Sequence, residues 1–285
     1  MDIRLDDDRK QTVAYQGEAG AYSEEGVEAL WPTAARLPLS SIRKVFEAVE
    51  VGRVDVGLVP MENSQAGSIN ETYDLFLKHG LHLVGEAVVQ VNHCLVALPE
   101  TSIDDLEEVT SHPQAIAQCE EFLGALGASI RAEYDTAGAA RRIADEKLVG
   151  TGAIASRRAA ELYGLSVLAE GIQTYPDNYT RFGALSRVPE PLTAPTKTSL
   201  VFGVGHVAGS LYRCLGAFAE RHLSLNKLES RPRGGRPWEY VFYADVEAPA
   251  SEPEMIEALA EVSEHATFTR VLGTYASAFA RRAAG

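Results

Sequence analysis

The chain of 285 residues has only three cysteines, Cys94, Cys119 and Cys214, and they lie far apart. An odd number of scattered cysteines fits neither a disulfide framework nor a zinc site, which favours a reducing compartment. No window approaches 18 uninterrupted apolar residues, and the first residues contain no apolar signal-peptide core. These absences predict a cytoplasmic protein with no membrane partner.

Basic residues are also scarce, because 26 lysines and arginines face 40 acidic residues and the formal net charge is −14. No basic stripe with interleaved aromatic residues occurs, so nucleic acid is not expected as a partner. The seven histidines show no metal-ligand spacing. We therefore expect no metal and no nucleotide. Because the net charge is negative, a site for an anion must have a positive electrostatic potential that is confined to that site.

What the sequence does contain is the alternation of an α/β protein. Short apolar runs at 54–60, 81–91, 152–156 and 182–188 predict strands, and amphipathic stretches around 40–51, 70–79, 113–127, 136–147 and 156–164 predict helices. The proline-containing stretch 186–199 reads as a linker, with a domain boundary near 190–197.

Beyond the linker, a small α/β domain is expected. The predicted order is a strand at 199–204, a helix at 209–222, a strand at 223–231, a Gly/Pro turn at 231–237, a strand at 239–246, a helix at 253–264 and a short strand near 267–272. This βαββαβ order within about 75 residues is that of a ferredoxin-like domain.

The segment at 177–186 offers the clearest chemistry. Thr180, Arg181 and Phe182 place a hydroxyl, a fixed cation and an aromatic face in consecutive positions at the start of a strand. Residues 180 and 182 of a strand share one face and residue 181 takes the other, and a turn at that point could aim all three at one cavity. The alternative is an ordinary strand start with a surface arginine.

Two further segments begin helices. Residues 59–76 follow an apolar strand and can present Glu62, Asn63 and Ser64 to a small anion, although the segment also reads as a plain loop with Asn70 as a cap.

The second segment is 111–123, in which Ser111 reads as a helix cap and Gln114 lies on the first turn, where free N–H groups favour a carboxylate. Alternatively, this is an amphipathic helix packed on the core. Cys119 is expected to pack there and not to act as a nucleophile, since no partner base is evident.

Taken together, five segments resemble the prephenate dehydratase family in their order and spacing: VAYQGEAGAYSEEGV (13–27), VPMENSQAGSI (59–69), SHPQAIAQC (111–119), DTAGAA (135–140) and NYTRF (178–182). The resemblance implies a cofactor-free catalytic domain over 11–190, with two α/β lobes similar to type II periplasmic binding proteins and a central cleft. It assigns Thr180, Arg181 and Phe182 to catalysis, and Glu62, Asn63, Ser64, Ser111, Gln114 and Asn178 to substrate binding.

The implied reaction is the decarboxylating dehydration of prephenate to phenylpyruvate in phenylalanine biosynthesis. We expect the Thr180 hydroxyl, as the last member of a relay, to donate a hydrogen bond to the departing hydroxide, and Arg181 to grip a substrate carboxylate.

The C-terminal part, over 197–275, looks like the ACT regulatory domain of that family. The resemblance implies a phenylalanine site made by Gly209, Ser210 and Leu211 together with Glu229, Ser230, Arg231 and Pro232, although Ser210 replaces the usual alanine. ACT domains commonly pair, which implies a homodimer or homotetramer.

Two other functions fit the same sequence. An arogenate dehydratase would carry out the same reaction on arogenate, the amino analogue of prephenate. The ammonium group of arogenate would favour an additional carboxylate in the cleft. A non-catalytic amino-acid sensor would combine a binding cleft with an ACT domain but would turn over neither compound.

Overall fold

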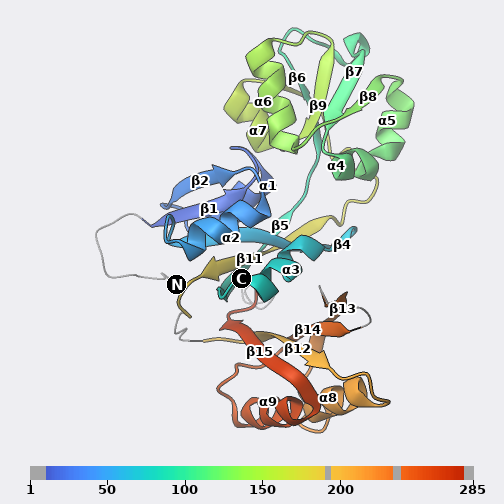
Figure 1. Cartoon of the computed structure of the whole chain (residues 1–285). Helices are drawn as coiled ribbons and strands as arrows, with labels where there is room; N and C mark the ends of the chain where they lie inside the picture. Colours follow the sequence, from blue (N-terminus) through green and yellow to red (C-terminus); the bar gives the residue numbers. More distant parts are fainter. Residues whose placement is uncertain (1–10, 190–193, 234–238, 279–285) are drawn as a thin grey trace. The chain divides into compact units, whose positions relative to one another are not determined.

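The computed structural model of the chain describes residues 11–189, 194–233 and 239–278 (Figure 1). They form two compact units, one joining the chain up to Thr72 with Ala87–Phe182 and the other joining Tyr73–Glu86 with the chain from Gly183 onward. The predicted domain limits remain predictions. Residues 190–193 of the expected linker and 234–237 of the expected turn lie outside the described residues.

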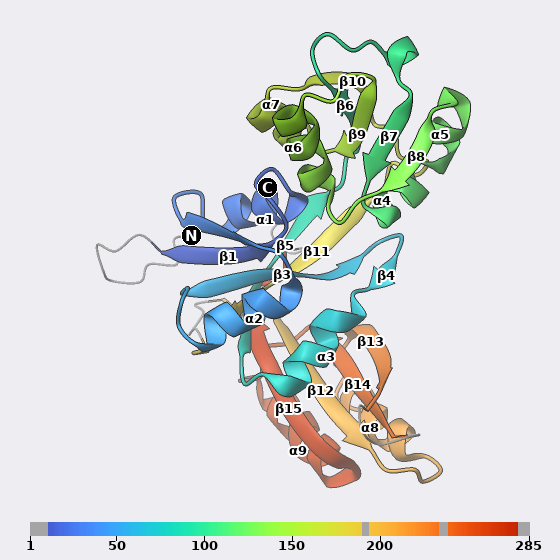
Figure 2. The ribbon, with the colours of Figure 1, turned by 45° about the horizontal axis from the view of Figure 1, so that its top comes forward.

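The first sheet is built from strands β1 Thr12–Gln16, β2 Ala35–Leu39, β3 Val56–Asn63, β4 Gly67–Ser68, β5 His82–Gln90 and β11 Tyr179–Ser186. Their order is β2-β1-β3-β11-β5, with β4 paired to β3. Strand β1 is parallel to both β2 and β3, and helices α1 (Tyr22–Leu30) and α2 (Ile42–Glu50) pack against β1 and β3 (Figure 2).

Helix α2 shows why the local sequence folds as it does. Its buried residues Ile42, Val45, Phe46 and Val49 recur with the period of an amphipathic helix. Its cap is Ser41, whose side chain accepts a hydrogen bond from the backbone N–H of Lys44.

The second sheet contains β6 Cys94–Ala97, β7 Glu108–Ser111, β8 Ser129–Ala132, β9 Thr151–Ala155 and β10 Ser166–Glu170, in the order β10-β6-β9-β7-β8. Its helices are α4 Pro113–Gln118, α5 Glu120–Leu126, α6 Thr136–Glu146 and α7 Arg157–Tyr163, and a 3₁₀ turn spans Ile103–Asp105. Helices α6 and α7 cover one face, while α4 and α5 cover the other (Figure 1).

The core under α4 and α5 contains Cys119, which is fully buried, and burial raises the pKa of its thiol to about 12. The expectation that Cys119 packs in the core is confirmed. We call residues 11–72 the first lobe and residues 94–170 the second lobe; both belong to the first compact unit.

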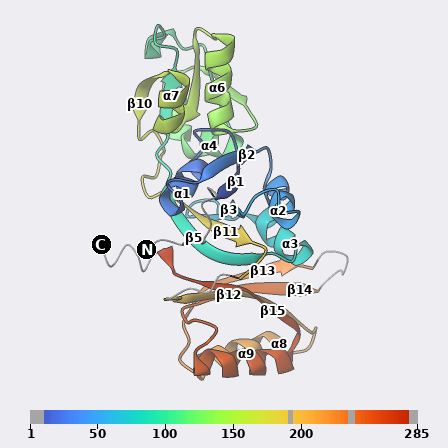
Figure 3. The same ribbon diagram turned by 90° about the vertical axis from the view of Figure 1, so that its left-hand side faces the viewer.

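The C-terminal sheet confirms the predicted βαββαβ order. Its elements are β12 Lys197–Val204, α8 Ser210–Ala219, β13 Leu225–Pro232, β14 Tyr240–Val246, α9 Pro253–His265 and β15 Ala266–Tyr275. The strand order β13-β14-β12-β15 is antiparallel throughout, and α8 and α9 lie together on one face (Figure 3). No helix in the described ranges is both long and apolar enough to cross a membrane.

In the second unit, the segment 73–86 is held by the C-terminal sheet. Helix α3 spans Asn70–Lys78, and the Arg270 guanidinium on β15 donates to the carbonyl oxygens of Phe76, His79 and Leu81, at 2.7, 3.1 and 2.6 Å. Carbonyl groups at a helix C-terminus lack intrahelical partners, so a cation there ends the helix without buried unpaired acceptors.

A buried charged cluster lies in the same unit. The Lys197 ammonium is 3.0 Å from a carboxylate oxygen of Glu86 and 3.5 Å from one of Asp245, and all three side chains are almost completely buried. Removing the lysine leaves both buried carboxylates without this countercharge.

We predict that Lys197→Met lowers the free energy of unfolding by about 3–5 kcal/mol, because two buried carboxylates lose their cation. Urea denaturation measures this, with Lys44→Met, at an exposed position on α2, as the control. A loss no larger than that of the control would contradict the role of the cluster.

Candidate functional site

A cavity of about 170 Å³ lies inside the first unit, and both lobes contribute to its wall. The first lobe provides Tyr22 at the start of α1 and Asn63 at the end of β3, and the second lobe provides Gln114 near the start of α4. Strand ends and helix starts commonly meet at such edges, where they present polar groups and free backbone N–H groups to a ligand.

Thr180 and Phe182, on β11, line this cavity. The side-chain amide of Asn63 donates to Thr180 Oγ1 at 3.1 Å, to Asn178 Oδ1 at 2.7 Å and to the Tyr179 carbonyl oxygen at 3.2 Å. Since the Thr180 oxygen is an acceptor in this bond, its own proton is available for donation elsewhere.

The orientation of the Asn63 amide is fixed from its other end. Its Oδ1 accepts the backbone N–H groups of Gln65 at 3.0 Å and Ala66 at 2.9 Å. An oxygen that accepts two backbone donors cannot exchange places with the amide nitrogen without leaving those donors unpaired. The nitrogen therefore points toward Thr180.

The network continues into the second lobe. Asn178 Nδ2 donates to Gln118 Oε1 at 3.0 Å, and the same oxygen lies 2.9 Å from His93 Nε2. Tyr22 OH lies 3.2 Å from His93 Nδ1 and donates to the Asn92 carbonyl at 2.8 Å. Burial lowers the pKa of His93, so the ring is neutral at pH 7 and donates from Nε2 to Gln118.

Four of the predicted cleft residues thus line the cavity: Asn63, Gln114, Thr180 and Phe182. Asn178 lies directly behind them, fully buried and bonded to Asn63. Their roles with a substrate remain predictions.

The expected placement of Arg181 in the cleft is wrong. Strand β11 runs without a turn through residues 179–186, so the side chain of Arg181 takes the face opposite Thr180 and Phe182. Arg181 is 4% exposed and its Nε donates to Glu62 Oε1 at 3.2 Å; neither residue lines the cavity. The pair stabilises the junction of β3 and β11.

Ser64 and Ser111 also lie away from the cavity wall. Ser64 Oγ donates to the Asp177 carbonyl oxygen at 3.0 Å and accepts the N–H of Tyr179. Ser111 ends strand β7 fully buried, and its hydroxyl donates to the Ile154 carbonyl oxygen at 2.7 Å. The substrate contacts predicted for both serines are not supported by this placement.

The N-cap of α4 is His112 and not Ser111, because His112 Nδ1 accepts the N–H of Gln114 at 3.2 Å. Tyr22, His93, Gln118 and Asp135 also line the cavity but are not among the predicted site residues. Gln118 could have been found, since it lies one helical turn after Gln114 and shares its face.

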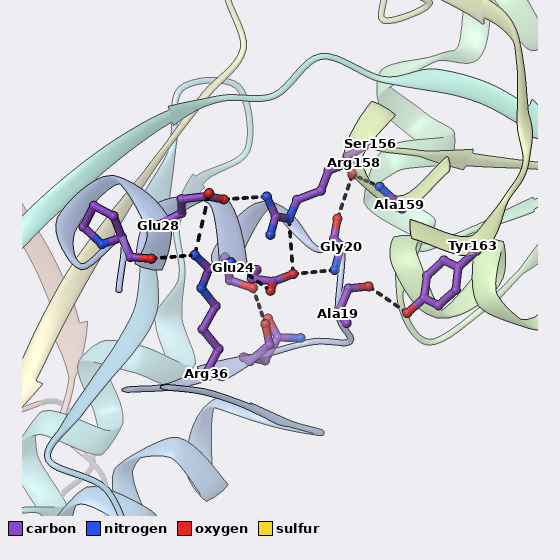
Figure 4. A network of polar contacts seen from close by, with 12 residues as sticks. Ala19, Gly20, Glu24, Glu28, Arg36, Ser156, Arg158, Ala159 and Tyr163 are labelled. Atoms are coloured by element: carbon purple, nitrogen blue, oxygen red, sulfur yellow. Dashed lines mark hydrogen bonds and ion pairs between the residues drawn. The ribbon is translucent and has the colours of Figure 1, made fainter. Parts of the chain in front are cut away.

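A second polar network joins the lobes beside the cavity (Figure 4). The Glu24 carboxylate accepts the N–H of Gly20 at 2.7 Å and pairs with Arg158 of the second lobe at 3.4 Å. Ser156, which caps α7, donates to the Gly20 carbonyl oxygen at 2.7 Å, and Tyr163 donates to that of Ala19.

Gly20 is required at this junction. Its φ of +88° is rarely adopted by other residues, and a Cβ there would lie 2.8 Å from the Cα of Ala159. The loop before α1 therefore packs directly against the start of α7, and the two lobes hold the cavity between them.

The predicted effector segments lie at the start of α8 and on β13. Gly209 is the N-cap of α8 with φ +81°, and the Ser210 hydroxyl donates to the Val207 carbonyl oxygen at 2.8 Å. Arg231 makes a two-pronged ion pair with Asp74 of α3, at 3.0–3.2 Å. An effector carboxylate at Arg231 would have to compete with Asp74.

Fold and cavity together define an α/β protein with a cavity lined by both polar and apolar side chains of its two lobes. The family model for prephenate dehydratase matches residues 13–190. This chain belongs to the prephenate dehydratase family. In the described ranges, no group of three or more His, Cys, Asp or Glu side chains could hold a metal ion.

Relatives cover nearly the whole chain. Arogenate dehydratase 1 of Petunia hybrida is 46% identical over 281 residues, an alignment that covers 92% of this chain and 66% of that protein. The chain thus spans about two thirds of that relative.

Two solved structures are similar along their length. The prephenate dehydratase of Arthrobacter aurescens in complex with L-Phe is 29% identical with a TM-score of 0.86, covering 94% of this chain and 90% of that chain. GqqA, described as a novel type of quorum quenching acylase, is 34% identical with a TM-score of 0.87. The match covers 95% of this chain and 100% of that chain.

The stability of the first unit is expected to depend on pH through Glu25 on α1. Burial, with repulsion from Glu28 and Glu24, raises the pKa of Glu25 to about 7, against attraction by Arg158. An acid whose pKa is raised by folding stabilises the protein below its unfolded pKa and loses that contribution as pH rises through the folded value.

We predict that Glu25→Gln raises the free energy of unfolding at pH 8 by about 1–2 kcal/mol, because no buried charge has to form, and has little effect at pH 5. Thermal unfolding at both pH values measures this. Equal effects at pH 5 and pH 8 would show that Glu25 does not titrate as described.

Proposed function

We propose that this chain removes water and carbon dioxide together from prephenate or its amino analogue arogenate, producing phenylpyruvate or phenylalanine in phenylalanine biosynthesis. The observation that carries the proposal is the bond from Asn63 Nδ2 to Thr180 Oγ1 on the wall of the cavity. Membership of the prephenate dehydratase family supports it.

The main catalytic requirement of the reaction is a proton donor for the departing hydroxide. As the C–O bond breaks, Thr180 gives its proton to the leaving oxygen, and the electron pair of the breaking C–C bond enters the ring and releases CO₂. The ring becomes aromatic, which supplies the driving force. Solvent returns one proton to Thr180, so one proton is consumed in each turnover.

A threonine hydroxyl is a weak acid, and Asn63 compensates for this. Negative charge develops on Thr180 Oγ1 as its proton leaves, and the Asn63 N–H is already aimed at that atom. A preorganised donor of this kind is worth about 2.7–4 kcal/mol of the barrier. Asn178 and Gln118 hold the Asn63 amide in place, and so complete the chain of hydrogen bonds that ends at Thr180.

The remaining groups of the wall suit an aromatising ring. Phe182 offers an apolar face, and the start of α1 at Tyr22 offers backbone N–H groups to a substrate carboxylate. The cation expected from Arg181 is engaged by Glu62 instead.

The C-terminal βαββαβ domain is proposed to be an ACT domain that binds phenylalanine. The antiparallel order β13-β14-β12-β15 supports this, and the Arthrobacter aurescens relative was solved with L-Phe. Strand β13 ends the sheet, and an edge strand can pair with a second copy, which agrees with a homodimer or homotetramer. The cytoplasmic location predicted from the sequence remains part of this proposal.

We predict that Thr180→Ser keeps kcat/KM within about 10-fold of wild type, while Thr180→Val lowers it by about 100-fold or more, because valine has the same shape but no proton to donate. Turnover of both substrates by the purified chain measures this, with thermal unfolding to confirm that each variant is folded. A fully active valine variant would exclude Thr180 as the donor.

We also predict that phenylalanine, but not glycine, raises the melting temperature and lowers kcat/KM. At 100 times its Kd, a ligand of the folded state alone adds about 2.7 kcal/mol of stability. Stabilisation by phenylalanine without turnover of either substrate would favour the non-catalytic sensor.

A further inference from the structure

The charge on the cavity wall is of one sign. Among the described residues that line it, Asp135 is the one acidic residue, and none is lysine or arginine. Burial lowers the pKa of His93 and, despite the nearby Asp135, that of His112, so both rings are neutral at pH 7. A ligand in this cavity meets a carboxylate and no side-chain cation.

Asp135 is fixed by the helix that it caps. It is 8% exposed, and its Oδ1 accepts the backbone N–H of Gly138 at 2.7 Å at the start of α6. Burial raises the pKa of Asp135, and the hydrogen bonds from Gly138 and Ala137 only partly offset this. A cation placed beside this carboxylate would therefore gain more than one placed in water.

The cap also decides what can bind at this end of the cavity. The positive end of the α6 dipole already faces the Asp135 carboxylate, so a second anion there would be repelled. A keto oxygen is only an acceptor and gains nothing from a carboxylate, whereas an ammonium group has three donors.

The two candidate substrates differ at this kind of group, since prephenate carries a keto oxygen where arogenate carries an ammonium. We infer that Asp135 binds the ammonium group of the amino-acid substrate and thereby makes arogenate the preferred substrate of this chain. The inference rests on the proposed function and adds the residue that selects between its two substrates.

The test compares kcat/KM for arogenate and prephenate in the wild type and in Asp135→Asn, with product identified as phenylalanine or phenylpyruvate. Asparagine can still cap α6 through its side-chain oxygen but carries no charge. We expect the wild type to prefer arogenate. The variant should lose about 10- to 100-fold for arogenate, mainly through KM, and less than about 3-fold for prephenate.

Asp145→Asn serves as the matched control, because Asp145 lies on the same helix with its side chain 70% exposed and does not line the cavity. It should leave the ratio of the two kcat/KM values unchanged. Asp135→Ser, which also retains a capping oxygen without charge, repeats the test if the asparagine variant does not fold.

An unchanged ratio in both Asp135 variants, or equal losses for the two substrates, would overturn the inference while leaving the dehydratase function standing. A wild type that prefers prephenate would overturn it as well. A wild type that turns over neither substrate would refute the proposed function itself, and this result is obtained before any variant is made.

Discussion

The side-chain amide of Asn63 holds the polar wall of the cavity together. Its nitrogen serves acceptors on three successive residues at the start of β11, and its oxygen takes two backbone N–H groups of the loop that follows β3. At 4% exposure, such an amide cannot lose these partners to water at low cost. The position of the Thr180 hydroxyl follows from this arrangement.

The same amide depends on both lobes. Gln118 of the second lobe bonds Asn178, and Asn178 bonds Asn63, so the relay is complete only when the lobes lie as they do here. On the other side, Glu24 and Arg158 connect the lobes beside the cavity (Figure 4). The close approach of Gly20 to Ala159 leaves little freedom at that junction.

Much of the fold was visible in the sequence, because helices such as α2 and the βαββαβ order are set by local periodicity. The motifs also named Thr180, Phe182 and Asn63, all three of which line the cavity. Arg181 was placed in the cleft through the family resemblance, but β11 continues as a regular strand between β3 and β5, so Arg181 takes the face opposite Thr180 and Phe182.

The hydrogen-bond partners of His93 and Gln118 could not be predicted from the sequence, because these contacts arise from long-range pairing. His93 meets Gln118 25 positions away, and Gln118 meets Asn178 60 positions away. No local pattern encodes such contacts. An aspartate directly before a helix commonly caps it, as Asp135 does, but its position on the cavity wall is not encoded locally.

The most direct test of the account is a double-mutant cycle between Asn63 and Thr180, measured as kcat/KM for the better substrate. If Asn63 acts by stabilising charge on the Thr180 oxygen, Asn63→Ala should cost about 10- to 100-fold in the wild type and less than about 3-fold in a Thr180→Val background. Losses that simply multiply would contradict the account, because Asn63 would then act without Thr180.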